Sequence, residues 1–373
     1  MRDSRIEKLA RLMLRHSMSI KKGEAFHITA DVAALPLVKA ILRQAKIIGA
    51  LAEVQLTQQE LTRMQLDLLD PEDQGVSARF LEEKAESGKR RFENLAGDIV
   101  IRSYANDQEL SKIPPAVQQL AAIKNKPFKD LLINHRRWVL FEYPTPGQAQ
   151  RAGMSFDDYI DFVLDVSSVD YAQMQKDVQP LKQLMEKTKH VHVTGRETDL
   201  HFSIENIPVI PCCGENNIPD GECFTAPVRH SVQGKLLVNT PSVFWGTVFH
   251  DIRLEFKDGK IIQASAGENT DLLNKILSSD EGARYIGEFA IGFNPLIREP
   301  FMNTLFDEKI SGSFHFTPGA CYDDAPNGND SSVHWDLVHI QRPEYGGGSI
   351  WFDDVEIRRD GLFLPPELKN LNP

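Results

Sequence analysis

Five side chains in the second half of the sequence are of types that bind metal ions. Two are carboxylates that close short motifs: Glu222 ends Asn-Ile-Pro-Asp-Gly-Glu, and Glu288 ends Gly-Ala-Arg-Tyr-Ile-Gly-Glu. His315 follows, and Ser-Val-His-Trp-Asp then supplies His334 and Asp336. Apolar and β-branched neighbours surround these residues, which is typical of strands. We interpret the five side chains as one site.

The last motif predicts two side chains that point the same way. Residues two apart on a strand share a face, so His334 and Asp336 project together while Trp335 turns away. An imidazole beside a carboxylate suits zinc, manganese or cobalt(II). One His-x-Asp pair is weak evidence alone, but five ligands exceed what one catalytic zinc usually takes from protein. Two ions about 3.5–4 Å apart need such a set, with one carboxylate shared.

These motifs resemble those of the M29 family, the thermophilic-aminopeptidase type of metallopeptidase. The resemblance rests on residues 217–227, 282–288, 303–308 (Asn-Thr-Leu-Phe-Asp-Glu) and 332–336, and on the spacing from His315 to Tyr322. Weaker similarity includes Tyr-Pro-Thr-Pro at 143–146 and reaches back to Gly23. It therefore covers nearly the whole chain.

The resemblance implies a ligand set for two divalent ions, zinc, cobalt or manganese: Glu222, Glu288, His315, His334 and Asp336. It also implies that Tyr322 assists the chemistry, where residue type alone would favour core packing. Glu288 is our candidate both for bridging the ions and for acid/base catalysis, although spacing assigns neither role.

The implied activity is a metal-dependent aminopeptidase that releases N-terminal amino acids from peptides. Two ions would activate a water, polarise the scissile carbonyl and anchor the free α-amino group of the substrate. Two alternatives stay open at this stage. One is a different two-metal hydrolase, acting on another amide or on a phosphoester, and the other is a non-enzymatic metal-binding protein with a decayed site.

The first half of the chain alternates extended and helical patterns. Strands are predicted at 25–29, 51–56, 98–102 and 138–142, and helices at 35–48 and 77–92. Gly49 follows the first helix as a stop signal. This alternation predicts an α/β domain with a doubly wound, mostly parallel sheet. No Gly-x-Gly-x-x-Gly follows the first strand, so a nucleotide site is not expected.

The pattern becomes β-rich near His190. Two helical segments, 156–166 and 171–187, precede the change, and hairpins are predicted at 191–204 and 252–263, the second turning at Asp258-Gly259. We therefore predict an α/β domain over 1–184 and an α+β, β-rich metal-binding catalytic domain over 185–373. The polar loop at 323–330, between Tyr322 and His334, is interpreted as a solvated loop or a rim of the site.

Histidines and cysteines outside the five ligands have ordinary interpretations. His192 and His201 alternate with apolar residues on predicted strands, as hydrogen-bonded or partly exposed strand histidines do. The four cysteines form no Cys-x-x-Cys motif, and we expect packing thiols: Cys212, Cys213, Cys223 and Cys321.

Charge and hydropathy restrict the partners of this chain of 373 residues. Its formal net charge of -11 argues against nucleic acid, because phosphate binding needs a basic surface. The sequence contains no run of 18 apolar residues, so no membrane span is predicted. The amino terminus lacks the pattern of a secretory signal. We expect a cytoplasmic enzyme that binds peptides with a free amino terminus. The resemblance further implies a homodimer built largely on the C-terminal domain.

Overall fold

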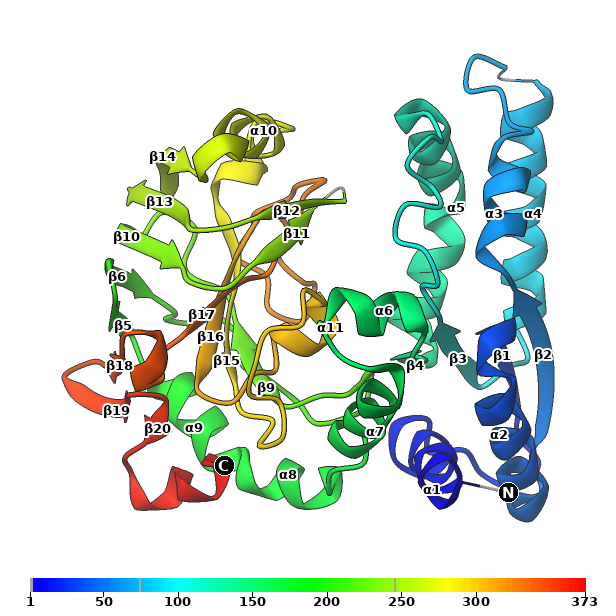
Figure 1. The fold of residues 1–373 in the computed structure, drawn as a ribbon, viewed down its shortest axis with the longest axis horizontal. Helices are drawn as coiled ribbons and strands as arrows, with labels where there is room; N and C mark the ends of the chain where they lie inside the picture. Colours follow the sequence, from blue (N-terminus) through cyan, green and yellow to red (C-terminus); the bar gives the residue numbers. More distant parts are fainter. Residues whose placement is uncertain (1–2, 74, 245) are drawn as a thin grey trace. The chain divides into compact units, whose positions relative to one another are not determined.

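A five-stranded parallel sheet organises the first half of the chain (Figure 1). The computed structural model describes residues 3–73, 75–244 and 246–373. The strands of this sheet, in the spatial order β2-β1-β3-β4-β8, are β2 (Leu51–Thr57), β1 (Ala25–Asp31), β3 (Gly97–Arg102), β4 (Arg137–Glu142) and β8 (Asn217–Ile218). Every neighbouring pair is parallel, which confirms the predicted α/β sheet.

The strand order explains why the sheet is doubly wound. The chain moves outward from β1 to β2 and then reverses past β1 to β3 and β4. Right-handed crossovers therefore place the helix after β1 and the helices after β2 on opposite faces. The helices of this half are α1 (Ser4–Leu12), η1 (Met13–Ser17), η2 (Val32–Ala34), α2 (Leu35–Ile48), α3 (Gln59–Leu66), α4 (Val76–Phe92), α5 (Pro115–His135), α6 (Pro146–Arg151) and α7 (Phe156–Val166).

Helix α2 has the predicted bounds because its end signals are strong. Pro36 lies in the first turn, and Gly49 after the helix takes φ 80°, which costs glycine little. By contrast, α5 was not predicted from the sequence. Only Val117 and Leu120 are buried along its length, and Pro127 lies inside it, so the helical pattern is weak.

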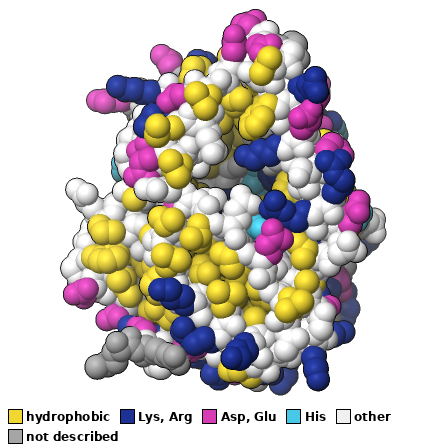
Figure 2. Space-filling model, turned by 90° about the vertical axis from the view of Figure 1, so that its right-hand side faces the viewer, with side chains coloured by type: hydrophobic (Ala, Val, Ile, Leu, Met, Phe, Trp, Pro, Cys, Tyr) yellow, Lys and Arg dark blue, Asp and Glu magenta, His cyan; other side chains and the backbone are white. Residues whose placement is uncertain are grey.

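Strand β2 leaves apolar side chains uncovered at the edge of the parallel sheet. Leu51, Val54 and Leu56 are 70%, 37% and 45% exposed. Leu61 and Met64 on α3 are also exposed, and Figure 2 shows apolar side chains gathered on this side of the molecule. Among the described residues, no helix has the length and apolar character needed to cross a membrane.

Two antiparallel sheets and a short hairpin make up most of the second half (Figure 1). The larger sheet has the order β14-β13-β10-β6-β5-β18-β19-β20. Its strands are β5 (His190–Gly195), β6 (Thr198–Ser203), β10 (Gln233–Val238), β13 (Ile252–Lys257), β14 (Lys260–Ser265), β18 (Gly348–Phe352), β19 (Val355–Arg359) and β20 (Leu362–Phe363). The predicted hairpins are present as β5–β6 and β13–β14, and Asp258 and Gly259 at the second turn take positive φ.

The smaller sheet has the order β17-β16-β15-β9-β7. Its strands are β7 (Ile210–Cys212), β9 (Glu222–Thr225), β15 (Ile286–Gly292), β16 (Ser313–Pro318) and β17 (Leu337–Ile340), while β11 (Ser242–Phe244) pairs separately with β12 (Thr247–Phe249). An aromatic core joins the two sheets, because the ring of Phe202 on β6 lies 4.9 Å from Phe289 and 5.1 Å from Phe316.

The helices of the second half are short. They are α8 (Tyr171–Asp177), α9 (Gln179–Lys187), η3 (Gly267–Asn269), α10 (Thr270–Ile276), η4 (Gly282–Arg284), α11 (Thr304–Asp307), η5 (Pro343–Tyr345) and η6 (Pro366–Leu371). The single helix predicted at 171–187 is wrong in one respect, because it is divided at Val178. Pro180 lies in the first turn of α9 and cannot donate a backbone hydrogen bond to the preceding turn.

By packing, the chain divides into two compact units. The first comprises Met1–Val169 and Gly214–Ile218, and the second comprises Asp170–Cys213 and Pro219–Pro373. The short strand β8 therefore belongs to the first unit although the chain around it belongs to the second. The domain division at 184/185 stays a prediction about folding domains.

Candidate metal centre

Strands β9, β15 and β16 place three of the five predicted ligands on one face of the smaller sheet. Phe289 and Phe316 point into the aromatic core, so the alternating residues Glu288 and His315 point the other way. Glu222 at the start of β9 is paired with Gly292 of β15, and Ala290 of β15 is paired with His315 of β16. Because Ala290 and Gly292 are two residues apart, Glu222 lies on the same face as His315. The sheet register thus brings together residues far apart in sequence.

The five predicted side chains meet in one cluster around Glu288, in which Glu222, Glu288 and His315 are buried and His334 and Asp336 are partly buried. One carboxylate oxygen of Glu288 lies 3.2 Å from Nε2 of His315, and the other lies 3.3 Å from Nε2 of His334. His315 Nε2 is also 3.6 Å from Oε2 of Glu222, and His334 Nε2 is 3.4 Å from Oδ1 of Asp336. Two three-residue groups result, Glu222–Glu288–His315 and Glu288–His334–Asp336, and each has three potential ligand atoms within 4.8 Å of one another.

The predicted strand at 332–336 is wrong, yet its two ligands still converge. His334 forms only an isolated bridge with Gly319, and β17 begins after Asp336. Nδ1 of His334 lies 2.8 Å from the carbonyl oxygen of Ala320, and Thr317 donates a hydrogen bond of 2.8 Å to Asp336. These contacts orient His334 and Asp336, whereas in a strand the hydrogen bonds to a neighbouring strand would do so. Trp335 turns away as predicted: its indole donates to Ser242 and packs on Phe249.

A buried lysine beside the cluster was missed by the sequence analysis. Nζ of Lys309 lies 2.5 Å from Oε1 of Glu222, 2.7 Å from Glu308 and 3.6 Å from Asp220, and its side chain is fully buried. Glu308 closes the motif at 303–308, and Lys309 is the next residue. A lysine after a motif is ordinarily solvated, and nothing local to the sequence signals its burial.

Unsatisfied polar atoms indicate that the cluster is built for a cation. Oε2 of Glu222, Nδ1 of His315 and Nε2 of His334 are buried without a hydrogen-bond partner. Buried polar atoms are nearly always paired, and buried carboxylates require a counter-charge or a metal ion. Because Lys309 holds Oε1 of Glu222, Oε2 is left facing His315. With Nδ1 of His334 engaged by a carbonyl, its Nε2 is the nitrogen available to a metal.

The charges of the cluster shift the pKa values of its members. Burial raises the pKa of Glu222 to about 7, with Lys309 opposing the shift, and burial likewise raises the pKa of Glu308 to about 7. Burial also disfavours ionisation of Glu288, but the hydrogen bond with His315 and the neighbouring imidazole of His334 lower its pKa. For His315, burial opposes protonation, yet the hydrogen bond with Glu288 and the charge of Glu222 raise its pKa to about 9. The carboxylates attract positive charge.

Tyr322 lies at the rim of the cluster and is not a core residue. Its side chain is 50% exposed, and its ring centroid is 4.8 Å from that of His334 and 5.5 Å from that of Phe224. Burial of the hydroxyl, together with the charges of Glu288 and Asp336, raises the pKa of Tyr322 well above its ordinary value. The phenol is therefore a hydrogen-bond donor over the physiological pH range.

The polar loop that follows Tyr322 is fastened to the protein at two asparagines. Asn327 donates to the carbonyl oxygens of Pro227 and Ile286, and Asn329 donates to those of Gly282 and Gly319. Ala325 is buried against Phe224 and Ala290. The loop is thus a fixed rim, which favours that interpretation over a freely solvated loop.

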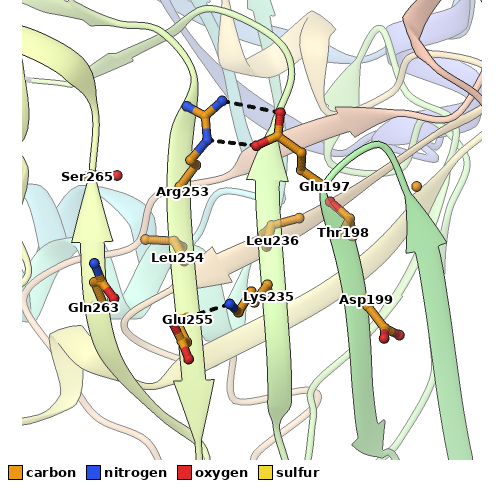
Figure 3. A pocket seen from close by; sticks show the side chains of 11 residues that line it. Glu197, Thr198, Asp199, Lys235, Leu236, Arg253, Leu254, Glu255, Gln263 and Ser265 are labelled. Atoms are coloured by element: carbon orange, nitrogen blue, oxygen red, sulfur yellow. Dashed lines mark hydrogen bonds and ion pairs between the residues drawn. The ribbon is translucent and has the colours of Figure 1, made fainter.

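A hollow on the larger sheet shares no residue with the cluster. It has a volume of about 600 Å³ and is lined by charged residues of β6, β10 and β13 (Figure 3). Its charges are paired with one another: Arg253 with Glu197, and Lys235 with Glu255. These two pairs engage four of the charged residues of the lining with one another, so the buried cluster is the stronger candidate for the metal centre.

Comparison with known proteins decides the family. The family model described as thermophilic metalloprotease (M29) matches residues 2–347. The chain belongs to the M29 metalloprotease family. This result confirms the resemblance drawn from the motifs. As an M29 metalloprotease, the protein is a hydrolase with a divalent metal cofactor, and the chemistry of the buried cluster fits such an ion.

Two relatives of this M29 metalloprotease and one solved structure match it along almost its entire length. It is 25% identical to aminopeptidase T of Thermus thermophilus over 404 residues, covering 96% of each chain. It is 24% identical to aminopeptidase 2 of Geobacillus stearothermophilus, covering 90% of this chain and 92% of that one. The solved structure of wild-type AmpT from Thermus thermophilus has the same fold, with a TM-score of 0.79, 24% identity and coverage of 97% and 99%.

Proposed function

We propose that this M29 metalloprotease is an aminopeptidase that releases N-terminal amino acids from peptides. The observation that carries the proposal is the position of Glu288, whose two oxygens each lie beside a different imidazole within one buried cluster. The full-length relatives named aminopeptidase T and aminopeptidase 2 support the same activity. All cluster residues fall within the predicted catalytic domain at 185–373.

The proposed cofactor is a pair of divalent ions, zinc, cobalt or manganese. Glu222 and His315 would hold one ion and His334 and Asp336 the other, with Glu288 shared between them. Mixed nitrogen and oxygen donors suit these ions better than soft thiolate sites do. Cys223 is buried and its pKa is raised by burial, which supports its interpretation as a packing thiol. When bound, the ions would polarise the scissile carbonyl, lower the pKa of the attacking water and anchor the substrate's α-amino group.

The side chains divide the remaining work. Glu288 is the proposed acid/base group, because it lies at the centre of the cluster with one oxygen beside each imidazole. Tyr322 is the proposed donor to the oxyanion of the tetrahedral intermediate, since its phenol lies at the open rim and retains its proton. Lys309 is a positioning residue: by holding Oε1 of Glu222 it leaves one oxygen of that carboxylate for an ion.

The proposed biological form is a cytoplasmic homodimer that acts on peptides with a free amino terminus and does not bind nucleic acid. The net charge of -11 supports the last two points, because it repels phosphate backbones and attracts a protonated amine. Light scattering of the purified protein tests the dimer directly. A mass equal to one chain of 42.1 kDa contradicts it.

A pair of chromogenic substrates tests the proposed activity. The protein should hydrolyse amino-acid p-nitroanilides with a free amine and leave their N-acetylated forms intact. Treatment with a chelator should abolish hydrolysis, and cobalt, zinc or manganese should restore it. Cleavage of both forms would indicate a different amidase, and turnover of p-nitrophenyl phosphate alone would indicate a phosphoesterase. Full metal occupancy without turnover on any peptide would indicate a metal-binding protein.

A further inference from the structure

Three side chains of metal-binding types meet on the β5–β6 hairpin of the larger sheet, and none belongs to the buried cluster. His192 on β5 lies directly opposite His201 on β6 in the antiparallel register. Asp199 precedes His201 by two residues, so both side chains point to the same face of the sheet. The hairpin therefore presents two imidazoles and a carboxylate side by side.

The ligand atoms of this trio converge on one point. Nε2 of His192 lies 2.8 Å from Oδ1 of Asp199, and Nε2 of His201 lies 3.4 Å from the same oxygen. All three atoms are within 4.8 Å of one another. A tetrahedral ion with bonds of about 2.0–2.1 Å separates its ligand atoms by about 3.4 Å. To admit an ion, the His192–Asp199 pair must move slightly apart and the two imidazole rings must turn towards it.

Stacked rings hold the imidazoles in place. The rings of His192 and His201 are 3.9 Å apart and inclined by 11°. Trp351 on β18 lies opposite His192 and stacks on its other side, at 5.0 Å and 21°. An ion bound by both Nε2 atoms must lie close to the plane of each ring, so the imidazoles turn out of this stack when they bind it. The stack also places an indole reporter beside the trio.

The carboxylate of the trio is not neutralised by a neighbouring cation. Lys235 is opposite Asp199 in the register, but its ammonium is the partner of Glu255. Arg253 pairs with Glu197, and Figure 3 shows the Asp199 side chain directed away from both basic residues. In the described part of the chain, the ion-pair partners of Asp199 are His192 and His201. Its charge is thus available to a bound cation.

We propose that His192, Asp199 and His201 form a second, surface metal site for one borderline divalent ion, such as Ni²⁺, Cu²⁺ or Zn²⁺. Two imidazole nitrogens and one carboxylate oxygen suit these ions and not Ca²⁺ or Mg²⁺. The three side chains are 33%, 69% and 58% exposed, so an ion reaches the site from solvent and keeps water at its open positions. The site is independent of the proposed peptidase activity.

Nickel titration of the holoenzyme tests the site. The protein is first loaded with zinc and freed of unbound ion, and Ni²⁺ binding is then followed by calorimetry and tryptophan fluorescence, with retained zinc measured by elemental analysis. We expect one Ni²⁺ per chain to bind without release of zinc and to quench fluorescence. His201→Ala and Asp199→Asn should each weaken this binding at least about tenfold, with peptidase activity unchanged.

Two control variants make the result decisive. His250→Ala removes an exposed histidine outside the trio and should bind nickel as the wild type does. Trp351→Phe should keep the calorimetric signal but lose the fluorescence change. Equal nickel affinity in His201→Ala and wild type overturns the proposal, and so does nickel binding that displaces the same amount of zinc from both proteins. Because the readout is binding at the hairpin, a failure of the peptidase assay leaves this result unaffected.

Discussion

The two units of this protein differ in which ionisable side chains they bury and which apolar side chains they expose. The second buries an array of ionisable groups around Glu288 and Lys309 behind an aromatic core. The first exposes large apolar side chains along β2 and α3. It also contains a buried histidine–carboxylate pair, His27 and Asp98, 3.1 Å apart across β1 and β3. Both units have well-formed sheets, so sheet formation does not account for the difference.

The contrast shows that the second unit loses folding stability by burying the ionisable groups that could do chemistry. Burying an ion costs several kcal/mol even after relaxation, and the cost is recovered only with close counter-charges and hydrogen bonds. In the cluster around Glu288, one ammonium serves three carboxylates, and Oε2 of Glu222 and Nε2 of His334 are buried without a hydrogen-bond partner. That deficit is what a bound cation removes, which is the physical reason to locate function there. In the first unit, the exposed apolar side chains indicate only that no other element of the described chain covers them.

The largest expected effect follows from removing the charge of Glu288. Glu288→Gln keeps the shape of the side chain but removes its basicity, so kcat/KM should fall by about 10² to 10⁴. Steady-state kinetics with metal content measured in parallel provides the test. Glu281→Gln, at a side chain that is 85% exposed, is the matched control and should be unchanged. Normal turnover of Glu288→Gln at full metal occupancy would rule out its acid/base role.

Removing Lys309 should expose the electrostatic cost of the cluster. Lys309→Met preserves the length of the side chain but leaves Glu222 and Glu308 without their ammonium, so the metal-free protein should lose about 3–5 kcal/mol of unfolding free energy. Added metal should recover part of the loss, because an ion offsets the same charges. Chemical denaturation with and without metal measures both effects.

Two further variants keep the Lys309 prediction testable if the methionine protein does not fold. Glu308→Gln removes one negative charge and should destabilise the protein less. Lys275→Met, at an exposed position on α10, should leave stability unchanged. If metal-free Lys309→Met is as stable as the metal-free wild type, the buried carboxylates do not lower the unfolding free energy when the ammonium is removed.

Loss of the Tyr322 hydroxyl should affect turnover and leave folding intact. Removal of one oxyanion donor typically costs about 10² to 10³ in kcat, and Tyr322→Phe should fall in this range with little change in KM. The exposed ring makes a stability effect small. Tyr285→Phe, whose ring lies under the guanidinium of Arg229, is the control. Unchanged kcat/KM in Tyr322→Phe would show that the hydroxyl does not stabilise the oxyanion and that Tyr322 only packs against its neighbours.

Acid should weaken the segment that leads to His334. Burial disfavours the charge of Asp280, but hydrogen bonds from Ser332, Ser331 and Ala283 lower its pKa to about 2. An unfolded aspartate has a pKa of about 3.9. The folded state therefore gains stability from this group above about pH 4, and the gain is lost as the pH falls towards 2.

Denaturation of Asp280→Asn at several pH values checks this sign. The variant should be less stable by about 1.5–3 kcal/mol at neutral pH, because charge-assisted hydrogen bonds are weakened. Its difference from the wild type should shrink as the pH approaches 2. Asp354→Asn, at an exposed position, should show no such trend. A difference that stays constant with pH would contradict the assignment to the Asp280 charge.

The smallest effect is expected on the exposed side of the first unit. Leu51→Lys and Leu56→Lys replace apolar side chains on the edge strand, and stability should change by no more than about 0.5 kcal/mol. Activity should be unchanged, and a homodimer built on the C-terminal domain should persist in light scattering. Dissociation of the dimer in these variants would show that the first unit also contributes an interface, and the contrast between the units would then need revision.

Several local elements were predictable because their signals lie within a few residues. Helix α2 was predicted with its observed bounds from its periodicity and Gly49, and the turn at Asp258-Gly259 located the β13–β14 hairpin. Helix α5 was missed because few of its residues are buried. The strand predicted at His334 failed for a related reason: alternation of residue types does not guarantee that a partner strand is available to complete a ladder.

The available chemical groups and the local form of many segments follow from the order of residues, since side-chain periodicity and turn preferences act over short distances. Long-range folding makes β9, β15 and β16 neighbours, places Glu288 between two imidazoles and buries Lys309 beside Glu222. Those facts depend on contacts between residues as distant as Glu222 and His315, and on burial that no single segment sets. The same residue types give a solvated surface or a reactive centre according to which strands pair.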